Sequence, residues 1–470
     1  MHKKDILKKK ARQICVIPSE YKLEIEDYSE DGARAVFAWK HPDEEDMGIW
    51  IELDGNGQLI DFTKDKSTEE MLRDILNQED LIKKALQFTE IHYPGVISKF
   101  KEERVQKIEE RLRVSYIQME LDLPLPFTGF YIDINEYGEI MQFHYDGAAE
   151  HIVFPECLQP EEKVRGEFLK DIQMNLMIVS LNEELYENGD NLPHLVYEPE
   201  LRFYEVPADG GLKVLREQHQ QEEPEPEPAY KNLSKFEFLG SPEVLTNLDA
   251  DFTKIREQDL GDAIGLVYRK DGDEPAAADD SIMTFFNKRN ENTIKVKRDK
   301  ETGKLLGFVS FYETSGNQLL SIKECERTAV QFLNAIYPNA HLYFMMDQEI
   351  ESDEERALFQ FDLIHYGISV RYGTARINVN RTTGKITHYL GPEVEPKLLI
   401  SVNRNPGISK ENAIELFSSV FKVEQQWTKE YKDHSESYYQ LVYKPVYPLF
   451  KGNLSFIDAK DGEFIVEKGF

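Results

Sequence analysis

One short pattern recurs along this chain of 470 residues and constrains its fold more than any other feature. Each copy is an alternating apolar run, an Asp or Asn, two or three further residues, a Gly, and then more apolar residues. Clear copies begin at Ile51, Ile132, Val296, Ile377 and Phe456, and a weaker copy begins at Val206. An Asp or Asn side chain can bond to its own downstream backbone, and Gly accepts positive φ, so each copy predicts a tight antiparallel hairpin. The expected structural turn positions are Asp54, Gly57, Asn135, Gly138, Gly211, Asp299, Gly303, Asn380, Gly384, Asp458 and Gly462.

The copies are spaced as a duplication would space them. The turn glycines form three pairs, separated by 246 residues for Gly57 and Gly303, 246 for Gly138 and Gly384, and 251 for Gly211 and Gly462. A second signal agrees, because the segments 88–100 (FTEIHYPGVISKF) and 332–344 (FLNAIYPNAHLYF) place their Tyr-Pro pairs 244 residues apart. The chain therefore reads as three units followed by the same three units again.

Each unit can be read as a helix followed by strands. Apolar residues recur every three or four positions from Ile322 to Ile336, Ser321 and Glu324 have capping-box spacing, and Pro338 ends the helical pattern. The period then changes to two, which is typical of strands with one buried face. The Asp or Asn lies three residues before its Gly in the first two copies and four in the last three. We therefore expect a two-residue type of turn in the former and a longer, bulged loop in the latter.

These patterns predict an α+β fold of six tandem units, each a helix packed on an antiparallel sheet, arranged as two three-unit halves. Between the halves, the segment 217–228 (EQHQQEEPEPEP) is acidic, Pro-rich and without large apolar residues, a composition that favours an extended spacer. The expected boundaries are 1–68, 69–155 and a divergent unit at 156–216, a linker at 217–229, and then 230–318, 319–398 and 399–470.

The helix that ends in a Tyr-Pro pair, the alternating strands and the glycine hairpins together resemble the PepSY-like repeats of the YcdB/YcdC type. These repeats occur in uncharacterised proteins of Gram-positive bacteria. The resemblance covers the whole chain and implies six PepSY-like units. No catalytic residues belong to this family, so the resemblance implies none here. PepSY-like domains are often extracytoplasmic and have been linked to peptidase inhibition, notably in protease propeptides.

The charge of the chain excludes some classes of partner. The 56 Lys and Arg residues face 87 Asp and Glu residues, which gives a formal charge of −31. Such a chain repels phosphate backbones and anionic lipids, so neither nucleic acid nor a membrane surface is an expected partner. No apolar run approaches the roughly 18 residues of a membrane span, and the N-terminal segment reads as a first helix rather than an export signal. We expect a cytoplasmic protein, with an extracytoplasmic location as the alternative that the resemblance implies.

The sequence offers little recognisable chemistry. It contains no phosphate-binding loop, nucleophile elbow or zinc-protease motif, so we expect no catalytic, cofactor-binding or metal-ligating residue. Glu52, Asp54, Asn56 and Gly57 imitate the start of an EF-hand, but the twelfth position falls on Thr63, where a Glu is needed.

Three further groups are read as structural. Three scattered cysteines predict small buried hydrophobes rather than disulfides, and they are Cys15, Cys157 and Cys325. The acidic runs at 43–46 and 352–355 predict solvated loops. A C-terminal tyrosine stripe predicts cross-strand packing, with an exposed recognition surface as the alternative, and its members are Tyr438, Tyr439, Tyr443 and Tyr447.

These observations favour a non-enzymatic repeat protein whose half-exposed sheets or sheet edges bind a protein or peptide, in one version as a peptidase modulator. Two alternatives stay open. The first is a hydrolase with a noncanonical acidic site between the halves. The second is a structural scaffold that assembles with itself. The sequence identifies no partner, and it leaves the oligomeric state open between monomer and dimer.

Overall fold

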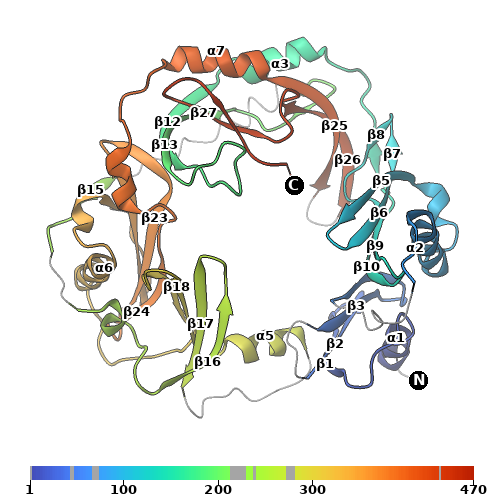
Figure 1. The fold of residues 1–470 in the computed structure, drawn as a ribbon, viewed down its shortest axis with the longest axis horizontal. Helices are drawn as coiled ribbons and strands as arrows, with labels where there is room; N and C mark the ends of the chain where they lie inside the picture. Colours follow the sequence, from blue (N-terminus) through green and yellow to red (C-terminus); the bar gives the residue numbers. More distant parts are fainter. Residues whose placement is uncertain are drawn as a thin grey trace.

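The chain forms a ring of β-sheets with helices on its outer side (Figure 1). The computed structural model describes residues 3–42, 47–65, 74–211, 229–236, 240–270, 281–432 and 436–469. The linker expected at 217–229 lies outside these ranges except for Ala229, and the acidic run at 43–46 lies outside them entirely. The α+β class and the internal duplication are confirmed.

The first sheet has eight antiparallel strands in the order β1-β2-β3-β4-β10-β9-β6-β5. Its strands are β1 (Lys22–Tyr28), β2 (Arg34–Lys40), β3 (Gly48–Asp54), β4 (Leu59–Lys64), β5 (Lys101–Ile108), β6 (Arg111–Ile117), β9 (Gly129–Asn135) and β10 (Ile140–Gly147). Between β6 and β9 a small hairpin projects, made of β7 (Met119–Glu120) and β8 (Leu123–Pro124). The accompanying helices are α1 (Lys3–Ala11), α2 (Gln78–His92) and the 3-10 turn η1 (Val96–Lys99).

The second half repeats this order as β16-β17-β18-β19-β24-β23-β22-β20. Its strands are β16 (Phe252–Asp259), β17 (Ala263–Lys270), β18 (Thr293–Asp299), β19 (Leu305–Ser310), β20 (Phe344–Asp347), β21 (Glu351–Ser352), β22 (Arg356–His365), β23 (Ile368–Asn380) and β24 (Ile386–Leu390). One further short strand, β15 (Tyr230–Asn232), pairs with β20. The helices are η2 (Pro242–Leu245), α5 (Ile282–Asn290), α6 (Ile322–Ile336), η3 (Ala340–Leu342) and η4 (Pro396–Ser401).

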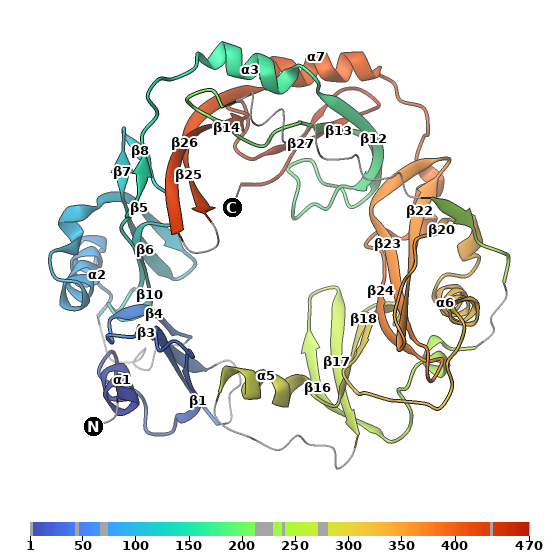
Figure 2. The ribbon, with the colours of Figure 1, turned by 180° about the vertical axis from the view of Figure 1, so that it is seen from behind.

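Helices α2 and α6 occupy equivalent places and have equivalent signals in the sequence. The Ser321 side chain accepts a hydrogen bond from the Glu324 N–H, and the Glu324 carboxylate accepts one from the Ser321 N–H. The predicted capping box is therefore confirmed. Both helices end at the tyrosine of their Tyr-Pro pair, Tyr93 and Tyr337. Their buried faces cover one face of each sheet and leave the other face free of helix. That helix-free face looks toward the middle of the ring (Figures 1 and 2).

The rest of the ring is built jointly by the two halves of the chain. The first half supplies β11 (Ile152–Val153), α3 (Glu161–Leu169), β12 (Gln173–Ser180), β13 (Pro193–Glu200) and β14 (Val206–Pro207). The second half supplies α7 (Lys410–Val420), β25 (Lys422–Lys432), β26 (Glu436–Val446), β27 (Leu454–Asp458) and β28 (Phe464–Val466).

These elements interleave. The hairpin β12-β13 pairs with β27, where Tyr197 lies opposite Ile457, and β27 in turn pairs with β28. The hairpin β25-β26 pairs with β14 and β11 of the first half. Helix α3 packs on β25, while α7 packs on β13 and β12. Each layer therefore draws strands from both halves of the chain.

The ring closes a second time where α5 meets β1. The Ile282 N–H donates to Asp27 Oδ2 at 2.9 Å, and Lys40 Nζ lies 5.3 Å from the centroid of the Phe285 ring. No residue of α5 is buried. This contact is therefore much thinner than the interleaved body on the opposite side of the ring.

Candidate functional site

The expected turn positions lie at separate hairpin tips. Asp54 Oδ1 accepts from the N–H groups of Asn56 and Gln58 at 2.9 and 2.7 Å, and Gly57 has φ of 81°. Equivalent carboxylate or amide oxygens accept backbone N–H groups at Asn135, Asp299, Asn380 and Asp458. Positive φ is also found at Gly138, Gly303, Gly384 and Gly462. In the weak copy, positive φ lies at Gly210 and not at Gly211.

The expected two-residue turn in the first two copies is wrong. Asp54 N–H donates to Gln58 O at 2.9 Å and Gly57 N–H donates to Asp54 O at 2.9 Å, so the loop has three residues. A β-bulge accompanies this loop, because β4 has one extra residue opposite the step from Glu52 to Leu53 of β3. The later copies have the longer loop, since Asp299 N–H donates to Lys304 O.

A polar network crosses the helix-free face of the first sheet. Arg113 on β6 donates to both carboxylate oxygens of Asp133 on β9, at 2.7 and 2.8 Å. The Arg113 guanidinium lies 4.3 Å from the centroid of the Tyr131 ring, and that ring stacks on His144 of β10 at 5.5 Å. Gln142 Nε2 donates to the Tyr131 hydroxyl at 3.0 Å. This network ties together the three neighbouring strands β6, β9 and β10.

His144 sits between two carboxylates within this network. Its Nδ1 lies 2.9 Å from Asp61 Oδ2 on β4, and its Nε2 lies 3.3 Å from Asp146 Oδ1. Hydrogen bonds from Asp146 and then Asp61 raise the pKa of His144 to about 10. The imidazolium therefore compensates part of the negative charge on this face at neutral pH.

The equivalent face of the second sheet has the opposite character. Lys295 and Lys297 on β18 occupy the positions of Trp50 and Glu52 on β3, because Lys297 lies opposite Gly307 as Glu52 lies opposite Asp61. Two more basic side chains share this face, Arg256 on β16 and Arg376 on β23. His388 on β24 lies beside them, and burial lowers its pKa, so it is neutral at pH 7. We call the four Lys and Arg residues the cationic face.

The cationic face is not neutralised within the described part of the chain. Lys297 and Arg376 are exposed, and no side-chain carboxylate of a described residue pairs with them or with Arg256. Lys295 is half-buried and donates to Asn290 Oδ1 at 2.6 Å. Burial, followed by the charges of Arg256 and Arg289, lowers the pKa of the Lys295 ammonium. Sequence reasoning missed this face, although aligning the turn residues Asp54 and Asp299, which are 245 residues apart, would have placed its lysines on Trp50 and Glu52.

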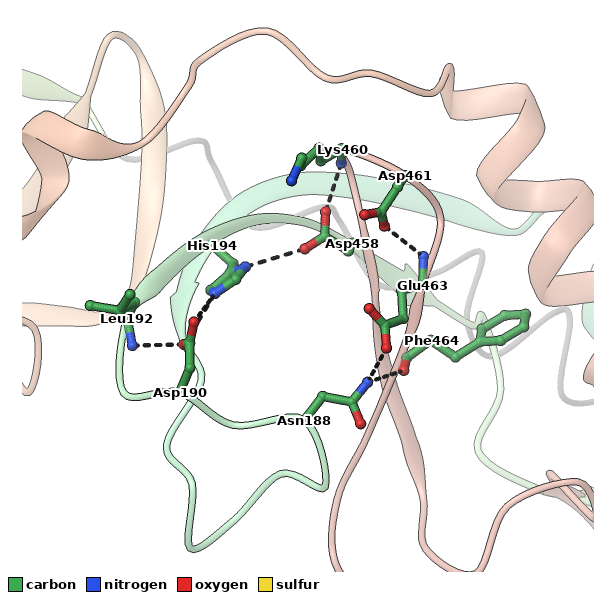
Figure 3. Close-up of polar contacts among 9 residues, drawn as sticks. All are labelled: Asn188, Asp190, Leu192, His194, Asp458, Lys460, Asp461, Glu463 and Phe464. Atoms are coloured by element: carbon green, nitrogen blue, oxygen red, sulfur yellow. Dashed lines mark hydrogen bonds and ion pairs between the residues drawn. The ribbon is translucent and has the colours of Figure 1, made fainter.

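A second histidine cluster ties the two halves together in the interleaved body (Figure 3). His194 on β13 lies 3.2 Å from Asp458 Oδ2 through Nδ1, and 3.1 Å from Asp190 through Nε2. Next to it, Asn188 Nδ2 donates to Glu463 Oε1 at 2.6 Å. Hydrogen bonds from Asp458 and then Asp190 raise the pKa of His194. Asp458 is thus the one expected turn residue that also belongs to a polar cluster, and its partners come from the other half of the chain.

The remaining sequence candidates have structural places. Tyr439 and Tyr443 are buried, with hydroxyls that donate to the loop carbonyls Pro126 O and Gln159 O at 3.0 and 2.7 Å. The other two members of the tyrosine stripe, Tyr438 and Tyr447, are half-buried. Cys325 is buried, but the expectation of a buried Cys157 is wrong because its side chain lies exposed in the loop before α3. The run at 352–355 forms an exposed turn.

Across the described ranges, no group of three or more His, Cys, Asp or Glu side chains is placed to hold a metal ion. Among the same residues, no helix has the length and apolar character needed to cross a bilayer.

Comparison with known proteins places these features in context. The chain matches the family described as "YcdB, YcdC repeated domain" twice, over residues 4–147 and 241–393. It is 40% identical to "Uncharacterized protein YcdB" of Bacillus subtilis (strain 168) over 471 residues, which cover 98% of this chain and 97% of that protein. "Uncharacterized protein YcdC" of the same organism is 35% identical over 462 residues, covering 96% and 97%. Among solved structures, the Bacillus megaterium YpeB C-terminal domain matches 48% of this chain and 94% of that chain, with 15% identity and a TM-score of 0.25.

Proposed function

Because the chain belongs to the YcdB/YcdC repeated-domain family, we propose that it is a non-enzymatic repeat protein that binds a protein or peptide partner. The partner engages the cationic face of the second sheet. The observation that carries this proposal is a set of exposed basic side chains without carboxylate partners among the described residues, in a chain of formal charge −31.

The geometry sets the kind of partner. Lys297 and Arg376 lie on β18 and β23, and two strands, β19 and β24, lie between them. At a strand spacing of about 4.8 Å, the two side chains start about 14 Å apart. An extended peptide of four or five residues, at about 3.3 Å per residue, spans this distance. The matching ligand is therefore an extended acidic segment of another protein. A peptidase with such a segment on its surface is one class of partner, and its inhibition would make this chain a peptidase modulator.

The architecture belongs to the same proposal. We read each helix with its sheet as one PepSY-like unit, six in all, with boundaries as expected from the sequence. In this reading the third and sixth units have exchanged their first hairpins, β12-β13 and β25-β26. Pairing of β13 with β27 and of β26 with β14 supports it.

The test uses a fluorescein-labelled peptide of alternating Glu and Ser, with fluorescence anisotropy measured from 50 to 300 mM salt. We expect saturable binding that weakens as salt rises, because charge pairing at a surface is screened. The double variant Lys297→Glu/Arg376→Glu should bind at least about tenfold more weakly. The control variant Lys83→Glu/Lys323→Glu makes the same change of charge on α2 and α6, on the outer side of the ring, and should bind within about twofold of wild type. Equal losses in both variants, or no binding at 50 mM salt, would refute the proposal.

A further inference from the structure

The edge of the second sheet carries an added strand. β15 pairs antiparallel with β20, with Tyr230 opposite Asp347, Lys231 opposite Met346 and Asn232 opposite Met345. Its backbone is tied at one end by the Gln348 N–H, which donates to Ala229 O at 2.8 Å. This short strand is an internal example of strand addition to a sheet edge.

Side chains on one face of the β15 segment anchor it. Lys231 faces α6, where its Nζ pairs with Glu326 Oε2 at 2.9 Å. Two residues on, Leu233 is 8% exposed and joins the main core. The pattern that holds the strand is therefore a basic residue followed two positions later by an apolar one.

The equivalent edge of the first sheet is open. Phe100 and Phe344 are buried at matching positions of the repeated segments. β20 begins at Phe344 and β5 begins at Lys101, directly after Phe100, so the two strands occupy equivalent places. Within the described residues, β5 has β6 as its single strand partner. Met346, covered by β15, is 0% exposed, whereas Glu102 at the same position of β5 is exposed. The same backbone edge is thus covered in one half and bare in the other.

We infer that β5 receives an extended segment of a partner protein as an antiparallel ninth strand. The segment has a Lys or Arg opposite Glu102 and an apolar residue two positions later. Opposite charges across a strand pair are stabilising. In the second sheet, Lys231 pairs with Glu326 on α6. The equivalent position on α2 is Ile82, and in the inferred complex it packs against the aliphatic part of the partner's basic side chain. This edge is distinct from the cationic face and goes beyond the function proposed above.

The probe is the chain's own strand, a labelled octapeptide with the sequence of residues 229–236 (AYKNLSKF). We expect it to bind the full-length protein and to slow hydrogen exchange at 101–108. Exchange at 344–347 should stay unchanged, because β15 already covers that edge. A peptide with Glu in place of the first Lys should bind at least about fivefold more weakly.

Variants of the edge separate the possible outcomes. The Gln348 N–H donates to the Ala229 carbonyl at the start of the β15 segment, and the Met346 N–H, two residues earlier, points to the same side. Glu102 has the position of Met346 in the first sheet, so its N–H points outward from the sheet edge. Glu102→Pro therefore removes an outward N–H, and we expect at least about tenfold weaker binding. Glu102→Arg tests the charge without altering the backbone, should Glu102→Pro fold poorly. The matched control is Glu110→Arg in the turn after β5, which should bind like wild type.

Results of three kinds would overturn the inference. One is absence of binding at millimolar peptide. Another is binding that both Glu102 variants leave unchanged, or protection at 344–347 in place of 101–108. The third is a protein that sediments as a dimer and becomes a monomer on Glu102→Pro, which would assign the edge to a second copy. The Lys297→Glu/Arg376→Glu variant should bind this octapeptide normally, so failure here and failure of the proposed function are distinguishable.

Discussion

Two polypeptides, 1–216 and 229–470, should assemble into one complex without a covalent link between them. The contacts that join them are specific. Tyr443 OH donates to Gln159 O at 2.7 Å, Tyr197 OH donates to Ile408 O at 3.1 Å, and Arg165 Nε donates to Phe421 O at 3.0 Å. The strand pairs β13-β27 and β14-β26 also cross the cut. Neither polypeptide can complete the interleaved layers alone.

The expected strength follows from the shared core. Both halves contribute buried apolar side chains to this body, and ten of them are Val164, Phe168, Ile172, Val196, Tyr197, Val206, Phe417, Phe421, Tyr443 and Ile457. Burial of each contributes about 1.5–3 kcal/mol, or about 15–30 kcal/mol together. Association costs about 4–15 kcal/mol in lost freedom of motion. The middle values of these two ranges differ by about 13 kcal/mol, which corresponds to a dissociation constant of about 1 nM or below.

The assay is co-expression with an affinity tag on 1–216 alone. We expect 229–470 to copurify at a 1:1 ratio and the pair to elute at the size of the intact chain. A control split into 1–148 and 149–470 leaves the first sheet whole on one side, so its parts should associate more weakly. Two soluble polypeptides that elute separately from the 1–216/229–470 pair would refute the interleaved arrangement.

Three smaller predictions concern stability. Ser321→Ala removes the N-cap of α6 and should cost about 1 kcal/mol in denaturant unfolding. Phe332→Ala, at a side chain 0% exposed, should cost about 3–5 kcal/mol, whereas Phe286→Ala, 54% exposed, should cost under about 0.5 kcal/mol. His144 has a raised pKa, so its contribution is complete below its unfolded pKa of about 6.5 and is lost as pH rises toward 10. The side chain is 32% exposed, so screening limits this contribution to about 1–2 kcal/mol, and His144→Gln should lower the melting temperature at pH 6 but not at pH 10.5.

Local patterns in the sequence predicted the local structure well. The start and end of α6 are marked by residues within it or next to it in the sequence, namely Ser321, Glu324 and Pro338. Its apolar spacing can also be recognised without knowing which distant residues it packs against. The internal duplication could likewise be predicted by comparing two stretches of the sequence with each other. These signals depend on neighbouring residues, so the helices and hairpins could be expected before the structure was known.

Long-range pairing could not be predicted in the same way. The strand that ends at Asp458 has the same hairpin pattern whether it pairs within its own unit or with β13. Which strand β27 pairs with depends on which apolar faces of the sheets are buried. Patterns in neighbouring residues do not contain that information. The exposure of Cys157 was missed for the same reason, since its apolar neighbours say nothing of the surface that the loop follows. The contrast between Met346 and Glu102 likewise depends on a three-residue strand more than a hundred residues away.

The central claim is that the cationic face binds an extended acidic segment, and photo-crosslinking tests it most directly. The acidic probe peptide would carry one benzoylphenylalanine at its centre, and the cross-linked residues would be mapped by mass spectrometry. Cross-links should concentrate on 293–299, 368–380 and 386–390, and Lys297→Glu/Arg376→Glu should abolish them. Cross-links confined to the outer helices α2, α6 and α7, unchanged in that variant, would contradict the claim.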